Sequence, residues 1–213
     1  VIDEQHRFGV IQRATLGGKG VNPDVLVMTA TPIPRTLALT TYGDLDVSVI
    51  RDLPPGRKPV NTHVRAVSER KSVYTLLDSE LESGRQGYIV YPLVEESEKS
   101  DLSAAKEMAD RLQKKEFRHR RVELLHGRMS PSLREEAMKK FVDHQVDLLV
   151  TTTVIEVGVD VSNASIMIVE NAERFGLSQL HQLRGRVGRG GHQSYCVLLY
   201  QEPLSETAGA RLE

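Results

Sequence analysis

The chain has 213 residues, enough for one large domain or for one domain and part of another. Its 28 Lys and Arg residues are balanced by 29 Asp and Glu residues, which excludes a polycation that binds nucleic acid through its whole surface but leaves room for a local basic stripe. Hydrophobic residues make up 39% of the chain, too many for a disordered protein, and the single cysteine excludes a disulfide scaffold and a cysteine-rich metal site.

The chain begins with Val1-Ile2-Asp3-Glu4, which includes no initiator methionine and no targeting pattern. Two β-branched residues before two acids predict the last residues of a buried strand. The segment Ala208–Glu213 has no terminating signal. We therefore expect the chain to be a piece of a longer polypeptide.

Short apolar runs then alternate with amphipathic segments, a pattern typical of an α/β fold with a parallel sheet and helices on both faces. The predicted strands are Val25–Thr29, Val60–Ala66, Gly87–Tyr91, Val122–His126, Val146–Thr151, Ser165–Glu170 and Ser194–Tyr200.

Three helices between these strands have apolar stripes at helical spacing. The first two stripes are Val73, Leu76, Leu77 and Leu81, and Ala105, Met108, Ala109 and Leu112. The third helix is predicted to begin after Ser130 as N-cap, with Pro131 at its first position. Its predicted buried stripe is Leu133, Ala137, Met138 and Phe141.

The segment 52–59 contains three prolines and a glycine, so we predict a linker there. It separates a remnant of one domain, residues 1–51, from a domain over 60–200, with 201–213 as the start of a following segment. The remnant is too short to bury a core alone, so it is expected to be the tail of a domain.

Two acids and two threonines follow the predicted strands of this remnant. Asp3 and Glu4 leave the carboxyl end of a strand, where α/β folds bind ligands and where phosphoryl transfer needs an acid for Mg²⁺ and a second for the attacking water. Thr29 and Thr31 follow the next strand, and their hydroxyls can bond a neighbouring carboxylate. The alternatives are a turn with solvated acids and an ordinary strand–loop–helix connection.

Three arginines, Arg184, Arg186 and Arg189, lie in a segment that ends in glycines. We expect a helix there, so that Arg186 and Arg189, three residues apart, project from one face. A planar guanidinium suits phosphate oxygens, and this pair is a candidate for arginine fingers. The alternatives are a solvated basic helix end and a passive nucleic-acid patch.

Two further segments follow predicted strands and could hold a phosphate backbone without reading bases. They are His126–Met129, before an N-capped helix, and Thr151–Thr153, which precedes Gly158 and Asp160. A threonine run also favours a strand by propensity alone. The basic run Arg111–Arg121 is interpreted as a solvated helix face and turn.

The sequence contains no Gly-x-x-x-x-Gly-Lys-Ser/Thr motif, because Gly17-Gly18-Lys19-Gly20 lacks the upstream glycine and the hydroxyl after lysine. A phosphate-binding loop is therefore expected before residue 1.

These constellations, in this order and at these separations, resemble the later motifs of superfamily 2 helicases. The resembling segments are Asp3–His6 for the Walker B box, Thr29–Thr31 for the third motif, Thr151–Asp160 for the fifth and Gln182–Arg189 for the sixth. Segments 3–10, 29–39 and 175–189 are shared in style by two bacterial families, the RecG branched-DNA helicases and the transcription-repair coupling factors. Segments 38–46, 53–59 and 193–196 are similar to RecG, so the chain is identified as a member of that family.

The resemblance implies two RecA-like lobes, part of a P-loop NTPase-type motor, with ATP and Mg²⁺ between them. Asp3 is then expected to hold Mg²⁺ through water, Glu4 to act as general base, and Thr29 and Thr31 to couple hydrolysis to lobe movement. The residues expected at the nucleotide are Gly158, Asp160, Gln182, Arg186 and Arg189. Those expected on the DNA backbone are His126, Gly127, Arg128, Met129, Thr151, Thr152 and Thr153.

The resemblance thus implies part of a bacterial, cytoplasmic, ATP-dependent DNA helicase that remodels forks and Holliday junctions in recombination and repair, with no membrane partner. Its P-loop lobe and wedge domain are expected in the rest of the polypeptide. One alternative is a coupling-factor-like duplex translocase. For the isolated chain, a catalytically inactive nucleic-acid-binding or interaction module is expected, since half a composite site binds ATP poorly.

Overall fold

The computed structural model describes residues 1–3, 26–28, 46, 48–50, 56–92, 106–152 and 160–212. The chain divides into two compact units, Val1–Asp52 and Leu53–Glu213. None of the helices in the described ranges has the length and apolar character needed to cross a lipid bilayer.

In the first unit, strands β1 (Ile2–Asp3) and β2 (Val27–Met28) pair in parallel. Ile2 lies opposite Val27 and Asp3 opposite Met28. The two strands therefore end at the same edge, and the acid Glu4 and the threonine Thr29 are the next residues in the chain after those ends.

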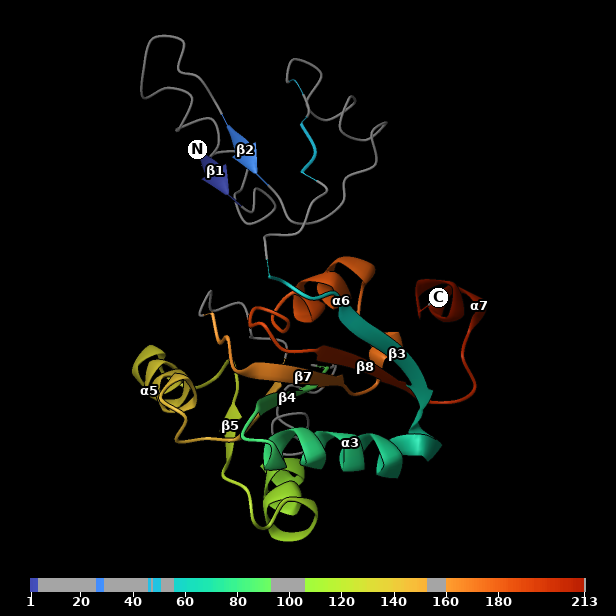
Figure 1. Cartoon of the computed structure of the whole chain (residues 1–213). Helices are drawn as coiled ribbons and strands as arrows, with labels where there is room; N and C mark the ends of the chain where they lie inside the picture. Colours follow the sequence, from blue (N-terminus) through green and yellow to red (C-terminus); the bar gives the residue numbers. More distant parts are fainter. Residues whose placement is uncertain are drawn as a thin grey trace. The chain divides into compact units, whose positions relative to one another are not determined.

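The second unit is built on a six-stranded sheet in the order β3-β8-β7-β4-β6-β5 (Figure 1). All neighbouring strands are parallel, which confirms the predicted α/β fold class. The strands are β3 (Val60–Ala66), β4 (Gln86–Tyr91), β5 (Val122–Leu125), β6 (Leu148–Thr152), β7 (Ala164–Val169) and β8 (Ser194–Tyr200).

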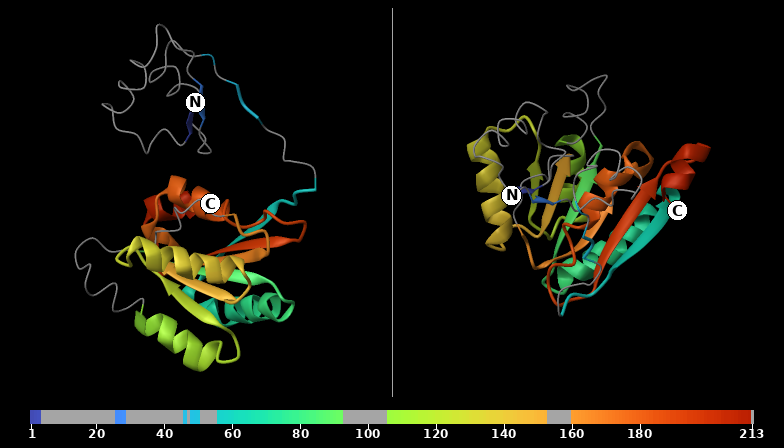
Figure 2. Two further views of the ribbon diagram at one scale, coloured as in Figure 1. Left: turned by 90° about the vertical axis from the view of Figure 1, so that its left-hand side faces the viewer. Right: turned by 90° about the horizontal axis from the view of Figure 1, so that it is seen from above.

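Helices cover both faces of this sheet (Figures 1 and 2). On one face lie α3 (Arg70–Glu82) and a helix whose described part, 106–111, continues into the π-helical turn η4 (Leu112–Glu116). On the other lie α5 (Pro131–Val142), α6 (Leu177–Arg184) and α7 (Glu206–Leu212). Short 3₁₀ turns η2 (Val67–Glu69) and η5 (Ala172–Arg174) precede α3 and α6.

Successive side chains of the central strand β7 pack alternately on the two faces. Ile166 and Ile168 belong to the cluster beneath α3, whereas Met167 and Val169 belong to the cluster beneath α5 and α6. A strand covered on both faces needs apolar residues at every position. This is why Ile166–Val169, most of β7, is a continuous apolar run rather than an alternating pattern.

Helix α5 begins as the sequence predicts, but its buried face is rotated from the predicted one. The Ser130 hydroxyl accepts a hydrogen bond from the Leu133 backbone N–H at 3.3 Å, and Pro131 is the first helical residue. The prediction that Leu133 is buried is wrong, since it is 51% exposed. The face that packs on the sheet is formed by the half-buried Arg134 and the buried Ala137, Met138 and Phe141. Leu133 precedes Arg134 by one residue and therefore points about 100° away from it around the helix.

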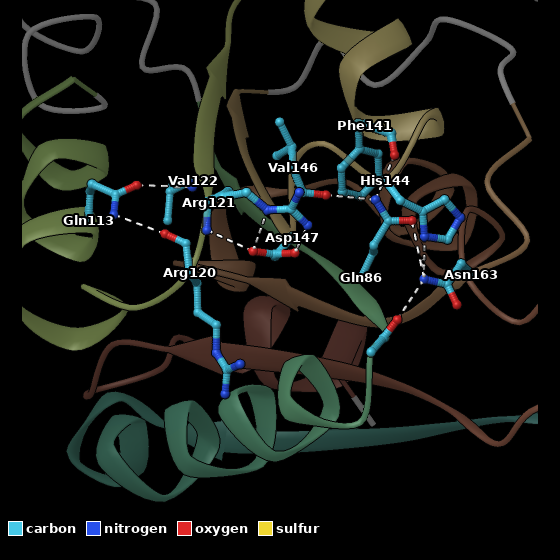
Figure 3. A network of polar contacts seen from close by, with 11 residues as sticks. Gln86, Gln113, Arg120, Arg121, Val122, Phe141, His144, Val146, Asp147 and Asn163 are labelled. Atoms are coloured by element: carbon cyan, nitrogen blue, oxygen red, sulfur yellow. Dashed lines mark hydrogen bonds and ion pairs between the residues drawn. The ribbon is translucent and has the colours of Figure 1, made fainter.

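A buried glutamine joins three connections near the amino ends of the strands (Figure 3). Gln86 donates from Nε2 to the Phe141 and Val146 carbonyls at 2.6 and 2.7 Å. Asn163 donates from Nδ2 to the Gly84 carbonyl at 3.0 Å and to Gln86 Oε1 at 3.3 Å. The two bonds that Gln86 donates are buried, and together the four bonds join the turns after α3, after α5 and before β7. They hold the turns at this edge of the sheet in fixed positions.

The basic run Arg111–Arg121 has acidic partners at both of its ends. Arg111 lies 2.9 Å from Glu116, and Arg121 binds Asp147 through its backbone N–H at 2.7 Å and its Nε at 3.1 Å (Figure 3). Although burial raises the pKa of Asp147, the hydrogen bonds and charge of Arg121 hold it below its usual value. The run is thus in part neutralised by local ion pairs.

Cys196 lies in β8 and is fully buried. Burial raises the pKa of its thiol to about 12, with the Arg184 charge acting in the opposite direction. The side chain serves as a small apolar core residue.

Candidate functional site

Parallel strands place all their carboxyl ends at one edge of the sheet, here called the carboxyl edge. Strand β5 ends at Leu125, just before His126–Met129, and β6 ends at Thr152. Leu125 lies opposite Thr151 in the register of these two strands. The two segments predicted to contact a phosphate backbone therefore leave the sheet from adjacent strands.

Polar atoms at this edge are buried without hydrogen-bond partners among the described residues. They include the Oγ1 of Thr152, a residue only 1% exposed, and Nδ1 of His126. Thr151, by contrast, donates from Oγ1 to the Thr152 carbonyl at 2.7 Å. An unsatisfied buried polar atom costs about 1–3 kcal/mol, so such atoms require an explanation, and a ligand is one.

The beginning of helix α5 adds positive potential to the same edge. Its backbone N–H groups follow His126–Met129, and Arg134 in its first turn has a buried Nε with no partner in the part of the chain that the structure describes. Burial lowers the pKa of His126, and the charges of Lys106 and Arg128 lower it further. The field at the carboxyl edge therefore favours an anion.

The arginine motif lies at the opposite, amino edge of the sheet. Helix α6 ends at Arg184 with Gly185 as its C-cap, so Arg186 and Arg189 follow the helix. The prediction that both project from one helix face is wrong, because the chain turns after Gly185 and Gly188 adopts a positive φ of 76°. We call residues 185–193 the arginine loop, and Gln182 precedes it on α6.

Two glycines allow the arginine loop to approach neighbouring segments closely. A Cβ on Gly190 would lie 2.4 Å from the Ser162 carbonyl oxygen, and one on Gly188 would lie 2.6 Å from Val60 Cγ2. Val187, directly before Gly188, is fully buried. The loop is therefore packed against the turn before β7 and against the first residue of β3.

Asp160 and the two loop arginines lie close enough to share an electrostatic environment. Arg189 Nη1 is 3.5 Å from Asp160 Oδ2, and Arg189 Nε donates to the Gly185 carbonyl at 3.0 Å. All three charges also act on the buried hydroxyl of Tyr88. Burial raises the pKa of Tyr88, the positive charges of Arg186 and Arg189 lower it, and the negative charge of Asp160 raises it. The structure therefore brings together these three residues, which the family resemblance assigns to one nucleotide site.

Comparison with known proteins identifies this architecture. A family model described as the helicase conserved C-terminal domain matches residues 69–191. This chain belongs to that family. The match includes the carboxyl edge and most of the arginine loop of the helicase C-terminal domain.

The relatives of this helicase domain confirm the resemblance stated above. It is 60% identical over 199 residues to the ATP-dependent DNA helicase RecG of Synechocystis, covering 93% of this chain and 24% of the relative. A solved structure of RecG bound to a three-way DNA junction is 47% identical, with a TM-score of 0.76, over 99% of this chain and 27% of that one. The chain thus spans about a quarter of the length of these relatives.

A more distant structure confirms the fold class. Domain 2 of the DEAD-box helicase Mss116p, bound to an RNA duplex, is 15% identical with a TM-score of 0.51, over 68% of this chain and 55% of that one. At this identity the likeness concerns the fold, which is the RecA-like second lobe of a helicase.

The helicase domain contains one polar cluster that the sequence analysis did not assign. Glu170, fully buried just after β7, lies 2.7 Å from Arg70 Nη2 and accepts a hydrogen bond from the Tyr74 hydroxyl at 2.9 Å. Burial raises the pKa of Tyr74 and the Glu170 charge adds to it. The sequence signal was an acid directly after an apolar run, as at Asp3. The cluster fixes the first turn of α3 to the end of β7.

Several predicted site residues fall outside the described part of the chain. These are Glu4, Thr29, Thr31, Thr153 and Gly158. Asp3 is placed only by its backbone, as the last residue of β1.

Proposed function

We propose that this chain is the second motor lobe, with the end of the first, of an ATP-dependent DNA helicase that remodels branched DNA such as forks and Holliday junctions. The observation that carries the proposal is the match, over 99% of the chain, to a structure of RecG bound to a three-way DNA junction. The RecG name of the relatives favours this function over that of a coupling-factor-like translocase.

In this proposal the domain limits are those expected from the sequence. Residues 1–51 are the remnant of the first lobe, 52–59 the linker, 60–200 the second lobe and 201–213 the start of a following segment. The division of the chain between Asp52 and Leu53 supports the first boundary. Helix α7 in the last segment is held by Arg211, which donates to the Glu173 and Phe175 carbonyls at 2.9 and 3.3 Å.

The arginine loop is proposed to meet the γ-phosphate of ATP. Arg186 and Arg189 would neutralise the charge that develops on the phosphoryl oxygens, which is the main contribution a protein makes to this reaction. Gln182 on α6 would contribute a polar amide from the same side, and Gly158 would approach the nucleotide. Asp160 beside Arg189 holds that guanidinium near the loop until the phosphate replaces the carboxylate.

The first unit is proposed to supply the acids of the reaction. Mg²⁺ prefers oxygen ligands, and Asp3 at the carboxyl end of β1 would hold it through water. Bound Mg²⁺ supplies charge neutralisation at the phosphates. Glu4 would accept the proton of the attacking water, and Thr29 and Thr31 would couple hydrolysis to movement between the lobes.

The carboxyl edge is proposed to hold the DNA backbone. His126–Met129, Thr151–Thr153 and the start of α5 offer hydrogen-bond donors and a positive field, which suit phosphate oxygens and carry no base specificity. Thr152 Oγ1 and His126 Nδ1, which have no hydrogen-bond partner among the described residues, support this role.

The nucleotide and DNA groups lie at opposite edges of one packed sheet. A lobe with such a rigid core moves as a body, so closure on ATP and reopening after hydrolysis would displace the DNA edge as well. Repeated cycles would move the motor along duplex DNA.

The isolated chain is proposed to be inactive as an ATPase, because its sequence contains no P-loop motif. The full-length protein would then supply the phosphate-binding loop and the domain that engages the branch. The bacterial source of the relatives and the sparse use of cysteine support a cytoplasmic setting.

The test is the ATPase rate of the full-length protein on forked and on linear duplex DNA, with the isolated chain measured in parallel. We expect strong preference for the fork and no turnover by the isolated chain. Equal stimulation by any duplex would instead indicate a general duplex translocase, and turnover by the isolated chain would contradict its inactivity.

A further inference from the structure

The arginine loop is bonded to the segment through which the chain enters the second unit. Arg57, in that segment, is half-buried and donates from Nε to the Gly188 carbonyl at 3.0 Å. Gly188 lies between Arg186 and Arg189 and has a left-handed backbone. The bond spans 131 residues of sequence and ends on the residue that sets the direction of the loop.

Two further contacts join the same two segments. Gln193 donates from Nε2 to the Pro59 carbonyl at 3.0 Å, at the other end of the loop. Gly188 also approaches the Lys58 carbonyl, since a Cβ on it would lie 3.9 Å from that oxygen. Residues 57–59 therefore follow the arginine loop closely and are hydrogen-bonded to it at two points.

We propose that Arg57 is a positioning residue for ATP hydrolysis: by holding the Gly188 carbonyl, it fixes the arginine loop to residues 57–59, through which the chain enters β3, so that the two move together. This inference rests on the proposed function, because it assigns a purpose to the position of Arg186 and Arg189. It adds a residue that contacts neither nucleotide nor DNA.

The physical reason is the steep dependence of phosphoryl transfer on geometry. Displacement of a catalytic group by about 1 Å can lower the rate about 100-fold. The four loop glycines, Gly185, Gly188, Gly190 and Gly191, leave the backbone little intrinsic stiffness. External bonds such as the one from Arg57 must then hold the two guanidinium groups in place. The same bonds would transmit a displacement of residues 57–59 directly to the arginine loop.

The experiment compares Arg57→Ala, Arg57→Lys and Arg65→Ala in the full-length protein by DNA-stimulated ATP hydrolysis. Arg65 is the matched control, an exposed arginine on β3 that bonds its neighbouring Val64 carbonyl at 3.2 Å and pairs with Glu69 at 3.6 Å. We expect Arg57→Ala to lower kcat about 10–100-fold with little change in the KM for ATP, since the guanidinium groups act on the transition state. Arg57→Lys retains a donor and is expected to retain most of kcat, and Arg65→Ala all of it.

A second readout separates positioning from a general loss of structure. Hydrogen exchange of the amides of residues 186–190 is expected to accelerate in Arg57→Ala while exchange in β4 and β7 stays unchanged. An unchanged kcat, or unchanged exchange in the loop, would overturn the proposal. Arg186→Ala is assayed alongside to separate this inference from the proposed function. If Arg186→Ala leaves hydrolysis intact, the proposed function fails. If Arg186→Ala abolishes hydrolysis but Arg57→Ala does not lower kcat, only this inference fails.

Discussion

At the carboxyl edge of the sheet, Thr152 and His126 bury polar atoms without partners among the described residues, whereas at the amino edge the arginine loop is held by several side chains and close backbone contacts. The first arrangement lowers stability and leaves bonding capacity for a ligand. The second restricts a loop whose glycines would otherwise let it move. The difference supports the proposal that DNA is bound at the carboxyl edge and that the arginines at the amino edge are held in place before ATP binds.

The largest effect is expected at the amino edge, from Arg186→Ala in the full-length protein. Loss of an arginine finger typically lowers the rate of phosphoryl transfer about 10³–10⁵-fold, so ATP hydrolysis should be nearly abolished while the fold is retained. Arg184→Ala is the matched control, because this exposed arginine lies in the same segment and contacts His181 at 3.4 Å. Steady-state ATPase assays and circular dichroism measure both; near-normal turnover would remove Arg186 from the mechanism.

A second prediction tests how tightly the arginine loop is packed. Gly190→Ala would place a methyl group against the Ser162 carbonyl and should destabilise the chain by about 2–3 kcal/mol. Gly191→Ala, one residue further, meets nothing within 4 Å and should be nearly neutral. Urea unfolding measures the difference. Equal stability of the two variants would show that the loop yields easily.

A third prediction tests the buried Thr152 hydroxyl at the carboxyl edge. Thr152→Val removes a buried hydroxyl without a described partner and should stabilise the chain by about 1 kcal/mol, while weakening the binding of DNA by the full-length protein. Thr151→Val removes a hydroxyl that is hydrogen-bonded at 2.7 Å and should destabilise by a similar amount. Urea unfolding and DNA titration of both variants test this prediction. If both variants changed the free energy of unfolding in the same direction, the expected difference between Thr151 and Thr152 would be contradicted.

The smallest effect concerns pH. Burial and the charges of Lys106 and Arg128 lower the pKa of His126, so the folded protein favours the neutral imidazole. Its stabilising contribution is therefore complete above the unfolded pKa of about 6.5 and is lost as the pH falls through the lower folded pKa. NMR titration should give a His126 midpoint below 6.5, and the stability of the native protein relative to His126→Asn should fall between about pH 7 and pH 5. A His126 titration midpoint at or above pH 6.5 would contradict a positive electrostatic potential at the carboxyl edge.

Most strands of the second unit could be predicted from sequence because they are largely apolar runs bounded by polar residues. Val60–Ala66 and Ser194–Tyr200 have the predicted limits, and the other four strands differ by one or two residues. The N-cap at Ser130 was equally clear, because a hydroxyl before proline has a local physical reason. Local chemistry therefore determined these elements.

Features that depend on long-range contacts were missed. The exposure of Leu133 depends on which face of α5 the sheet covers, and the end of α6 at Arg184 depends on the packing of Gly188 and Gly190 against distant segments. The Glu170 cluster joins residues about 100 positions apart, which spacing along the chain does not reveal. The same is true of Arg57, whose partner becomes visible only when β3 and β8 pair side by side.

The buried thiol of Cys196 makes this protein convenient for spectroscopy. With a pKa of about 12 and no exposed surface, it forms almost no thiolate at neutral pH and should not react with maleimide reagents in the folded state. Because it is the only cysteine in the sequence, new cysteines placed on exposed positions of the two units would be the sole labelling sites in this chain. Fluorophore pairs attached there could follow the opening and closing of the motor in single molecules, with the native core left unaltered.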